Sequence, residues 1–325
     1  MTEASTTRPS RSGLLLSIAR WFDSSAGGGD AGGDPWRIDW FRCLPFLLLH
    51  VGCLGVIWVG WSWTAVWVAV GLYVLRMFAI TGFYHRYFSH KTYKTSRPAQ
   101  LVFAVLGNSS VQRGPLWWAA HHRHHHSNTD KEEDVHSPAR HGFLWSHMGW
   151  LMTGASFPTR RERVPDWAKF PELVWLNRFD TLVPLLLAAA LYGVGASLAA
   201  WAPGLGTSGP QMLVWGFFIS TVVLFHATAT INSLDHMFGR RRYNTPDTSR
   251  NNWFLAVLTL GEGWHNNHHH CATPVRQGFF WWELDVTYCL LVLLSWLGVV
   301  WDLRPVPKGV REKNLALDRQ SGGAA

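Results

Sequence analysis

The sequence predicts an all-α membrane protein with four transmembrane helices in two hairpins and a helical cap on one side of the membrane. Residues 43–75 and residues 181–234 contain no aspartate, glutamate, lysine or arginine, although the mean hydropathy of the chain is only +0.01. The apolar residues are therefore concentrated in two segments. Because about 20 apolar residues cross a bilayer, each segment can hold two crossings if the first continues to about residue 83.

Each apolar segment contains a natural turn near its middle. Gly60-Trp61-Ser62 divides the first segment, and the run from Pro203 to Pro210 divides the second. We therefore expect spans at residues 43–61, 63–83, 181–201 and 211–231. The alternative for the first segment is one long tilted span. That topology would separate the basic N-terminal segment from the basic central loop.

The net charge of +8 is distributed as the positive-inside rule predicts. Arg37 and Arg42 precede the first hairpin, residues 160–163 carry arginines between the hairpins, and residues 240–242 follow the second hairpin. Neither hairpin tip carries a charge. We expect an integral protein of the cell (inner) membrane with both termini and the cap in the cytoplasm. Topology accounts for the basic surplus, so no nucleic-acid partner is expected.

Three further segments complete the predicted organisation. Residues 1–38 are rich in glycine and are expected to form a flexible tail, residues 39–305 to form one domain, and residues 306–325 a C-terminal tail. The apolar run at residues 286–301 is too short for a regular span. Arg76 lies near the inner end of the second span, where its long side chain is expected to reach the interface.

Histidines form the main candidate site. His-x-x-His-His occurs at His122/His125/His126 and again at His265/His268/His269. On a helix, positions i, i+3 and i+4 share one face, so each triplet is expected to direct three imidazoles toward the same volume of space, and imidazole is the commonest metal ligand. His121/His124/His125 fits the first pattern equally well.

Two more histidine positions lie at the ends of predicted spans. His85-Arg-Tyr-Phe-Ser-His90 follows the second span, and a spacing of five suits a single helix face poorly, so one histidine is expected where the helix ends. His236 leaves the fourth span in Asn-Ser-Leu-Asp-His. With four spans, all of these histidines emerge on the same side of the membrane.

Taken together, these motifs resemble the integral-membrane fatty acid desaturases of the stearoyl-CoA type over roughly residues 40 to 305. The family pattern is HxxxxH, HRxHH, a histidine after Asn-Ser, and GEGxHNxHH; here the chain has HRYFSH, HRHHH, NSLDH and GEGWHNNHH in that order. Because the family places arginine directly after the first ligand of the second motif, the resemblance selects His122 over His121. His121, His124 and His270 are then bystanders or groups that support the ligands without binding the metal.

The resemblance implies a di-iron site with nine histidine ligands. One iron would be held by His85, His90, His122, His126 and His268, and the other by His125, His236, His265 and His269. Asn232 would position a bound water. Carboxylates commonly orient ligating imidazoles, and the candidates for that role are Asp134, Asp235 and Glu262.

The activity implied by the resemblance is O2-dependent desaturation of a fatty acyl chain. Two Fe ions would activate O2 and leave a cis double bond, most often at the ninth carbon. Since the chain has no iron-sulfur or haem motif, the electrons are expected from a separate ferredoxin-, rubredoxin- or cytochrome b5-like protein with its reductase. The acyl chain needs an apolar tunnel, whose candidate residues are Ala69, Tyr73, Trp118 and Trp264.

One departure leaves the form of the substrate open. Where the animal enzymes of the family have an Arg-Asp pair that helps to hold CoA, this chain has Ala120 and His121, and a later basic pair is replaced within residues 153–155. A fatty acyl thioester or an acyl lipid therefore both fit. The alternatives to desaturation are a di-iron acyl or alkyl hydroxylase and, from a different class, a histidine-rich zinc-binding membrane receptor or transporter.

Overall fold

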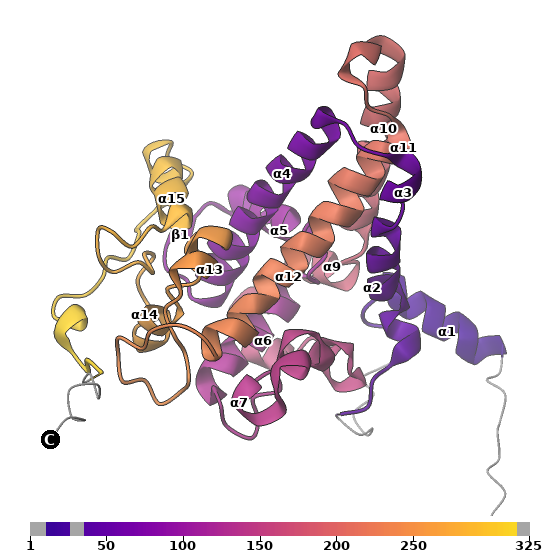
Figure 1. Ribbon diagram of the computed structural model, residues 1–325. Helices are drawn as coiled ribbons and strands as arrows, with labels where there is room; N and C mark the ends of the chain where they lie inside the picture. The colour runs from indigo at the N-terminus through magenta and orange to yellow at the C-terminus, as the bar shows by residue number, and fades with distance from the viewer. Residues whose placement is uncertain (1–10, 27–35, 317–325) are drawn as a thin grey trace, which may run out of the picture.

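The computed structural model describes residues 11–26 and 36–316. Within these residues, four helical segments are long and apolar enough to cross a membrane: Trp40–Val59, Trp63–Ser89, Leu182–Trp201 and Gly209–His236. They form a bundle, with the tip of the second hairpin at the end farthest from the cap (Figure 1). The predicted four-span helical membrane fold is confirmed.

Most spans are built from more than one helical element. The first comprises α2 (Trp40–Cys53) and α3 (Val56–Val59), the second α4 (Trp63–Phe78) and the π-helix η1 (Ala79–Ser89), the third α10 (Leu182–Trp201), and the fourth α11 (Gly209–Met212), the π-helix η7 (Leu213–Ile219), α12 (Ser220–Ser233) and the 3₁₀ turn η8 (Leu234–His236).

Both hairpin turns form where the sequence predicts them. Gly60 and Gly206 have φ of +63° and +62°, a region that glycine enters without steric cost. Ser62 and Ser208 then cap the returning helices, their hydroxyls accepting from the backbone N–H of Ala65 and Gln211. The turn chemistry therefore sets the two helix pairs.

The four spans differ in burial. In the most apolar window of the second and fourth spans 50% of residues are buried inside the protein, against 6% and 17% for the first and third. The second and fourth spans are thus the inner pair. They also continue past the predicted ends at residues 83 and 231, to Ser89 and His236.

Arg76 does not reach the interface, and this expectation was wrong. Its side chain is 1% exposed, and its guanidinium donates to the hydroxyls of Ser220 and Thr221 on α12. It also donates to the Ser109 carbonyl. Polar partners on the neighbouring span satisfy the buried cation, so the side chain does not need to leave the bundle.

The 3₁₀ turn η6 (Pro203–Leu205) lies in the turn of the second hairpin, and the cap contains most of the other elements. Its helices are α5 (Arg97–Asn108), α6 (Pro115–Asn128), α7 (Pro138–His141), η2 (Trp145–Gly149), η3 (Trp150–Met152), η4 (Gly154–Ser156), η5 (Arg161–Arg163), α8 (Pro165–Ala168), α9 (Pro171–Arg178), α13 (Trp253–Leu258), α14 (His265–His270), α15 (Val286–Trp296) and η9 (Val310–Glu312). Strands β1 (Lys94–Thr95) and β2 (Val300–Trp301) pair antiparallel.

The predicted terminal tails contain regular structure in the parts that are described. Helix α1 occupies Arg11–Phe22 within the predicted flexible tail, while residues 1–10 and 27–35 of that tail lie outside the described residues. Near the C-terminus, the backbone N–H of Ala316 donates to Arg242. Residues 306–316 therefore pack on the cap, and residues 317–325 are not described.

The core packs around η1, the element that enters the cap from the membrane. Every residue of η1 is buried, and the rings of Phe83 and Phe103 stack with centroids 3.8 Å apart. Gly107 on α5 lets Tyr84 approach, since a Cβ there would lie 2.1 Å from the tyrosine ring. This packing fixes the helix that carries His85.

Candidate metal centre

The π-helix η1 explains the spacing of His85 and His90. In a π-helix the backbone N–H of residue i+5 bonds to the carbonyl of residue i, and His90 N donates to His85 O at 3.2 Å. The two imidazoles therefore lie close together, with ring centroids 4.8 Å apart. His90 ends the helix, as predicted, although the π geometry was not foreseen.

The nine predicted histidines form two groups. Cluster 1 contains His85, His90, His122, His126 and His268, and cluster 2 contains His125, His236, His265 and His269; in each, one nitrogen per ring lies within 4.8 Å of all the others. These memberships match the two ligand sets drawn from the resemblance. Each triplet is divided between the two clusters, as those ligand sets imply.

Within each cluster the ring nitrogens are spaced like ligands of one ion. In cluster 1, Nε2 of His268 lies 3.1 Å from Nε2 of His85 and 2.9 Å from Nε2 of His126. In cluster 2, Nε2 of His236 lies 3.1 Å from Nε2 of His265. Imidazole nitrogens bind a metal at about 2.0–2.1 Å, so neighbouring ligands at right angles lie about 3 Å apart.

Two buried nitrogens support the same conclusion. Nε2 of His125 and Nε2 of His269, both in cluster 2, have no hydrogen-bond partner among the described residues. A buried polar atom without a partner is costly unless something else satisfies it. A metal ion at this position would satisfy both nitrogens, so the residues fit the implied group.

Two glycines shape the loop that carries His265. Gly261 has φ of +126°, and a Cβ on Gly263 would lie 2.1 Å from the Ala256 backbone nitrogen. Only glycine allows this contact, which brings the loop against the end of α13. Glu262, between the two glycines, is thereby directed into the protein and is 2% exposed.

Two of the three predicted carboxylates contact histidines. Glu262 Oε2 lies 2.5 Å from His85 Nδ1, and Asp134 Oδ2 lies 3.1 Å from His125 Nδ1. Asp235 does not: its carboxylate oxygens have no partner among the described residues. Adjacent residues on a helix point about 100° apart, so proximity to His236 in sequence does not give contact.

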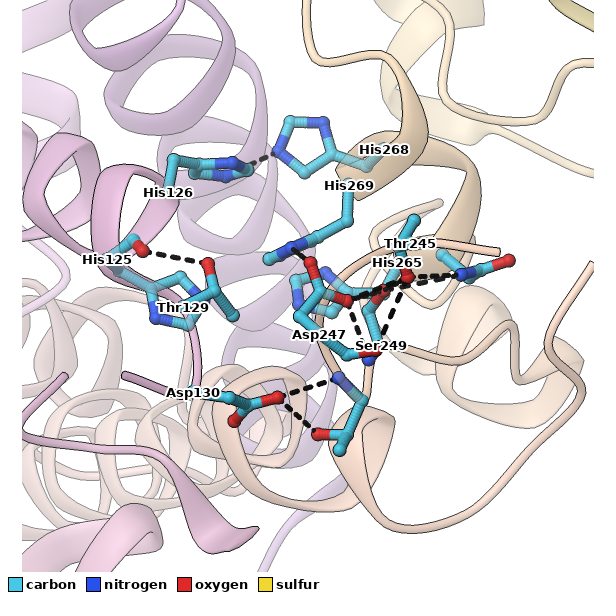
Figure 2. Close-up of polar contacts among 12 residues, drawn as sticks. His125, His126, Thr129, Asp130, Thr245, Asp247, Ser249, His265, His268 and His269 are labelled. Atoms are coloured by element: carbon cyan, nitrogen blue, oxygen red, sulfur yellow. Dashed lines mark hydrogen bonds and ion pairs between the residues drawn. The ribbon is translucent and has the colours of Figure 1, made fainter. Parts of the chain in front are cut away.

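Cluster 2 has two further acidic contacts that the sequence analysis missed. Asp247 Oδ2 lies 2.8 Å from His269 Nδ1, as Figure 2 shows. Nδ1 of His236 lies 3.2 Å from the Thr248 hydroxyl, which donates to Asp130 at 2.8 Å. Both acids lie on loops distant in sequence from the histidines they serve, and no spacing rule indicates them.

Cluster 1 also has a partner that the sequence analysis missed, the amide of Gln277. Its Nε2 lies 3.2 Å from His85 Nδ1 and 3.5 Å from His268 Nδ1, while its Oε1 is buried without a partner. Amide oxygen and nitrogen are assigned from such contacts. Turning the amide by 180° lets the oxygen accept from the Nδ1–H of His268.

The electrostatics favour neutral imidazoles and ionised acids. Burial, with neighbouring histidines adding to it, holds the pKa of His122, His126 and His268 well below the usual value. Burial would raise the pKa of Asp134 and Asp247, but the adjacent imidazoles and hydrogen bonds hold both below the usual range. Neutral imidazole is the form that binds metal.

One cavity reaches both clusters. Its lining includes His85 and His122 from cluster 1, His265 from cluster 2, and the predicted residues Asn232 and Trp118. Gln112 Nε2 donates to Thr228 Oγ1 at 3.0 Å in its wall. Among the residues described, the lining does not include Ala69, Tyr73 or Trp264.

Those three tunnel candidates have other partners. The Tyr73 hydroxyl donates to the Leu258 carbonyl at 2.6 Å, and Trp264 Nε1 donates to Leu284 at 2.8 Å. Ala69 is buried within α4. The cavity instead lies among α2, α6, η1 and α12, because the segment at residues 42–49 supplies part of its wall.

The predicted bystander histidines lie outside both clusters. His124 Nε2 is 3.0 Å from the Glu133 carbonyl, and His270 Nε2 is 3.1 Å from the Val310 carbonyl. His121 stacks on Trp117 with centroids 4.4 Å apart. His136 was not predicted: it stacks on His125 at 4.4 Å and lines the cavity.

The fold and the site together define a multi-pass membrane protein with two buried histidine clusters able to bind metal. The sequence model of the fatty acid desaturase family matches residues 61–288, and the chain belongs to that family. It is a desaturase, an oxidoreductase that acts on fatty acyl chains. This membership separates it from zinc-binding receptors and transporters.

Several characterised desaturases are similar to this chain. An acyl-CoA 5-desaturase of Anemone leveillei is 37% identical over 82% of this chain and 80% of its own length. An sn-1 stearoyl-lipid 9-desaturase of Anabaena variabilis is 34% identical over 84% and 96%. A chloroplastic palmitoyl-monogalactosyldiacylglycerol delta-7 desaturase of Arabidopsis thaliana is 36% identical over 78% and 66%.

Proposed function

We propose that the two histidine clusters each hold one iron ion and that the chain introduces a cis double bond into a saturated acyl chain. The observation that carries this proposal is the single cavity that reaches both clusters. The histidines of the two clusters would hold the iron ions, which would supply the O2 activation needed to take one hydrogen from each of two neighbouring methylenes. O2 and those hydrogens, with two electrons and two protons, yield two waters.

The protein residues would position the ligands and the substrate. Glu262, Asp134 and Asp247 accept from ligand N–H groups and so keep each Nε2 directed inward. The apolar wall, with Ile80, Phe225 and Trp118, would hold the acyl chain and exclude water. Asn232, also in the wall, would hold a water beside cluster 2.

We further propose that the ninth carbon is the site of desaturation and that a separate redox protein supplies the electrons. The named positions of the relatives are five, seven and nine, so wall shape is expected to select among them. The arginines on the cap side support a cytoplasmic cap and an acidic electron donor.

The test is expression of the chain with a redox partner in a host of simple lipid composition. Wild type should yield acyl chains two mass units lighter, with the double bond at one position located by mass spectrometry. His265→Ala should abolish the product, whereas the bystander variant His124→Ala should retain it. A product sixteen mass units heavier would indicate the hydroxylase alternative, and no product from wild type would contradict the proposal.

A further inference from the structure

The C-terminal part of the cap exposes a large apolar surface. On α13, Trp253, Phe254 and Val257 are 70%, 60% and 52% exposed, while Leu255 and Ala256 are buried against the protein. The loop before α15 and α15 itself expose further large apolar side chains: Trp281, Trp282, Leu284, Leu293, Trp296 and Leu297. Together these exposed residues form the C-terminal apolar surface. Exposed apolar surfaces of this size mark contacts with a protein or a membrane.

The sequence of both helices is free of charge. Residues 251–261 and 286–301 contain no aspartate, glutamate, lysine or arginine. Asp285, which directly precedes α15, is buried and pairs with Arg86. A protein interface has a polar rim around its apolar centre, whereas a helix that is apolar on every face is typical of a membrane or a deep core. The composition of α13 and α15 therefore favours hydrocarbon as their surroundings.

Two hydrogen bonds attach this surface to the second span within the thickness of a bilayer. The Tyr73 hydroxyl donates to the Leu258 carbonyl at 2.6 Å, and the hydroxyls of Thr81 and Thr287 lie 2.7 Å apart. Since α4 begins at Trp63, a rise of 1.5 Å per residue places Tyr73 about 15 Å and Thr81 about 25 Å along the span. The hydrocarbon core is about 30 Å thick. The end of α13 and the start of α15 therefore lie at membrane depth.

The backbone where α13 ends is paired as that depth requires. The Leu255 carbonyl accepts from both the N–H and the hydroxyl of Thr259, and the Leu260 carbonyl accepts from the N–H of Thr287 at 2.8 Å. Irregular backbone occurs at membrane depth only where protein groups satisfy its hydrogen bonds. The chain reversal after α13 is therefore suited to surroundings without water.

Lipid-facing side chains of the second span lie beside this surface. On α4, Trp67, Val70 and Val74 are 66%, 45% and 41% exposed. Helix α13 packs against α12, and α15 packs against η1, so both helices lie alongside the inner pair of spans (Figure 1). A bilayer that covers α4 would therefore extend over α13 and α15.

Exposed tryptophans support the same depth. Tryptophan is enriched at both membrane–water interfaces. At the outer ends of the spans, Trp58, Trp61 and Trp201 are exposed. On the cap side, Trp253 and Trp281 of the C-terminal apolar surface are exposed as well. This surface supplies tryptophans for the interface on the side of the cap.

We propose that the C-terminal apolar surface is inserted into the bilayer leaflet on the side of the cap, with α13 and α15 as embedded helices that do not cross the membrane. Its partner is lipid hydrocarbon. Residues 259–264 connect α13 to His265 and carry Glu262, so the embedded helices hold this loop against the second span. Insertion goes beyond the proposed function and requires no catalysis.

A spin label on α15 tests the proposal directly. Cys289 is an exposed native thiol; Cys53 and Cys271 are replaced by alanine, and the buried Cys43 is kept. The full chain is reconstituted in vesicles of phosphatidylcholine and phosphatidylglycerol. Collisions of the label are measured with O2, which concentrates in hydrocarbon, and with a polar nickel chelate, which stays in water. The ratio of O2 to nickel collisions should be higher at Cys289 than at the exposed cap position Lys131→Cys by roughly tenfold or more.

Labels at other positions provide the second reading and the matched control. Phe254→Cys reports on α13, and Leu48→Cys reports on a side chain of α2 that is 52% exposed in the first span. Both variants, like Lys131→Cys, also carry Cys289→Ala. Phe254→Cys should give the same high ratio as Leu48→Cys. Val257→Cys, on the same face of α13, replaces Phe254→Cys if the latter does not show the thermal unfolding of wild type.

Two results would overturn the proposal. A ratio at Cys289 and on α13 as low as that at Lys131→Cys would place the surface in water. Few collisions with either reagent would show that protein covers the surface, as in contact with a second copy of the chain. Both readings come from protein without substrate, so they are independent of whether the chain forms a double bond.

Discussion

Clusters 1 and 2 use the same ligand type, but the groups behind their ligands differ in charge. In cluster 2, His125 contacts Asp134, His269 contacts Asp247, and His236 reaches Asp130 through Thr248. Within the described residues, none of these three carboxylates forms an ion pair with arginine or lysine. Cluster 1 has one carboxylate contact, Glu262, which is shared with Arg86 at 3.0 Å.

This difference indicates how a protein can make two nearly identical histidine sites unequal. A carboxylate that accepts the Nδ1–H of a ligand increases the basicity of that imidazole and strengthens its bond to a cation. Cluster 2 has two such acids, Asp134 and Asp247, and a third, Asp130, that acts through the Thr248 hydroxyl, so we expect it to hold its metal more tightly than cluster 1. The uncharged amide of Gln277 and the neutralised Glu262 give cluster 1 the weaker hold.

Metal removal should have the largest effect. A chelator that strips both clusters leaves buried imidazoles facing one another without a cation. At a metal concentration a thousandfold above Kd, loss of the ligand costs about 4 kcal/mol of unfolding free energy. The thermal unfolding temperature in detergent should fall sharply as chelator is added. The first decrease should come from loss of metal from cluster 1.

The comparison would be contradicted if cluster 2 lost its metal first or if both were lost together. Variants that lack one cluster identify the order in which the metals are lost. His268→Ala disrupts cluster 1, so chelator can remove metal only from cluster 2 in this variant. His124→Ala, which changes a histidine outside both clusters, should respond to chelator like wild type.

Replacing the orienting acids should have the next largest effect. Asp247→Asn keeps the shape but removes the charge behind His269, so the metal affinity of cluster 2 should fall about 10- to 100-fold. Glu262→Gln should lower the affinity of cluster 1 and, in addition, leave Arg86 with Asp285 as its one acidic partner among the described residues. Competitive chelator titration measures both.

Asp235→Asn provides a matched control for these acids, because Asp235 is buried but its carboxylate forms no hydrogen bond with a cluster histidine or any other described residue. Its metal affinities should match wild type. If Asp235→Asn and Asp247→Asn lowered metal affinity equally, the contact between an acid and a cluster histidine would not explain the effect.

Gln277 should have a smaller effect, confined to cluster 1. Gln277→Leu removes the acceptor for His268 and should weaken that cluster by about 10-fold, the lower end of the range for such partners. Gln277→Glu keeps an acceptor and should restore affinity to the wild-type level or above. If leucine and glutamate behave alike, the side chain fills space and does not orient His268.

The smallest effect concerns an ion pair that anchors helix α6, which serves both clusters. Arg123 and Lys91 hold the pKa of Asp166 at about 2, although burial opposes them. The lowered pKa means that this stabilisation is present above about pH 4 and is lost as pH falls toward 2. Asp166→Asn should cost about 1–2 kcal/mol at pH 7.

Thermal unfolding against pH checks this prediction. The difference in unfolding free energy between wild type and Asp166→Asn should shrink as the pH falls below 4. The substitution should change the metal affinity of both clusters equally. A difference that stays constant down to pH 2, or one confined to one cluster, would contradict it.

The sequence predicts the spans and the cluster members better than the groups that orient them. Uncharged length and turn residues are local properties, and they locate the hairpins. Histidine spacing supplies the candidates, but only the resemblance to the desaturase family selects the nine, because spacing alone fits His121/His124/His125 equally well. The contact of Asp247 with His269 depends on how a loop folds over 22 positions, which no local pattern encodes. Asp235, next to a ligand, therefore looked a better candidate than it is.

The same reasoning explains the π-helix and the cavity. The spacing of His85 and His90 fits a helix only if the hydrogen bonds shift to i+5, and tight packing of η1 against α5 selects that geometry. The sequence analysis expected Ala69 and Tyr73 of the second span to line the tunnel, but among the described residues neither belongs to the cavity wall. Side chains of α2 and α6 complete the wall instead.

The most direct test of the account is the iron content per chain of His268→Ala and His265→Ala after anaerobic loading with ferrous ion. Wild type should bind two irons, and each variant should retain one, with cluster 2 of His268→Ala holding its iron more tightly than cluster 1 of His265→Ala. If either single substitution removes both irons, or if wild type binds one, the two clusters are not independent iron sites and the account is wrong.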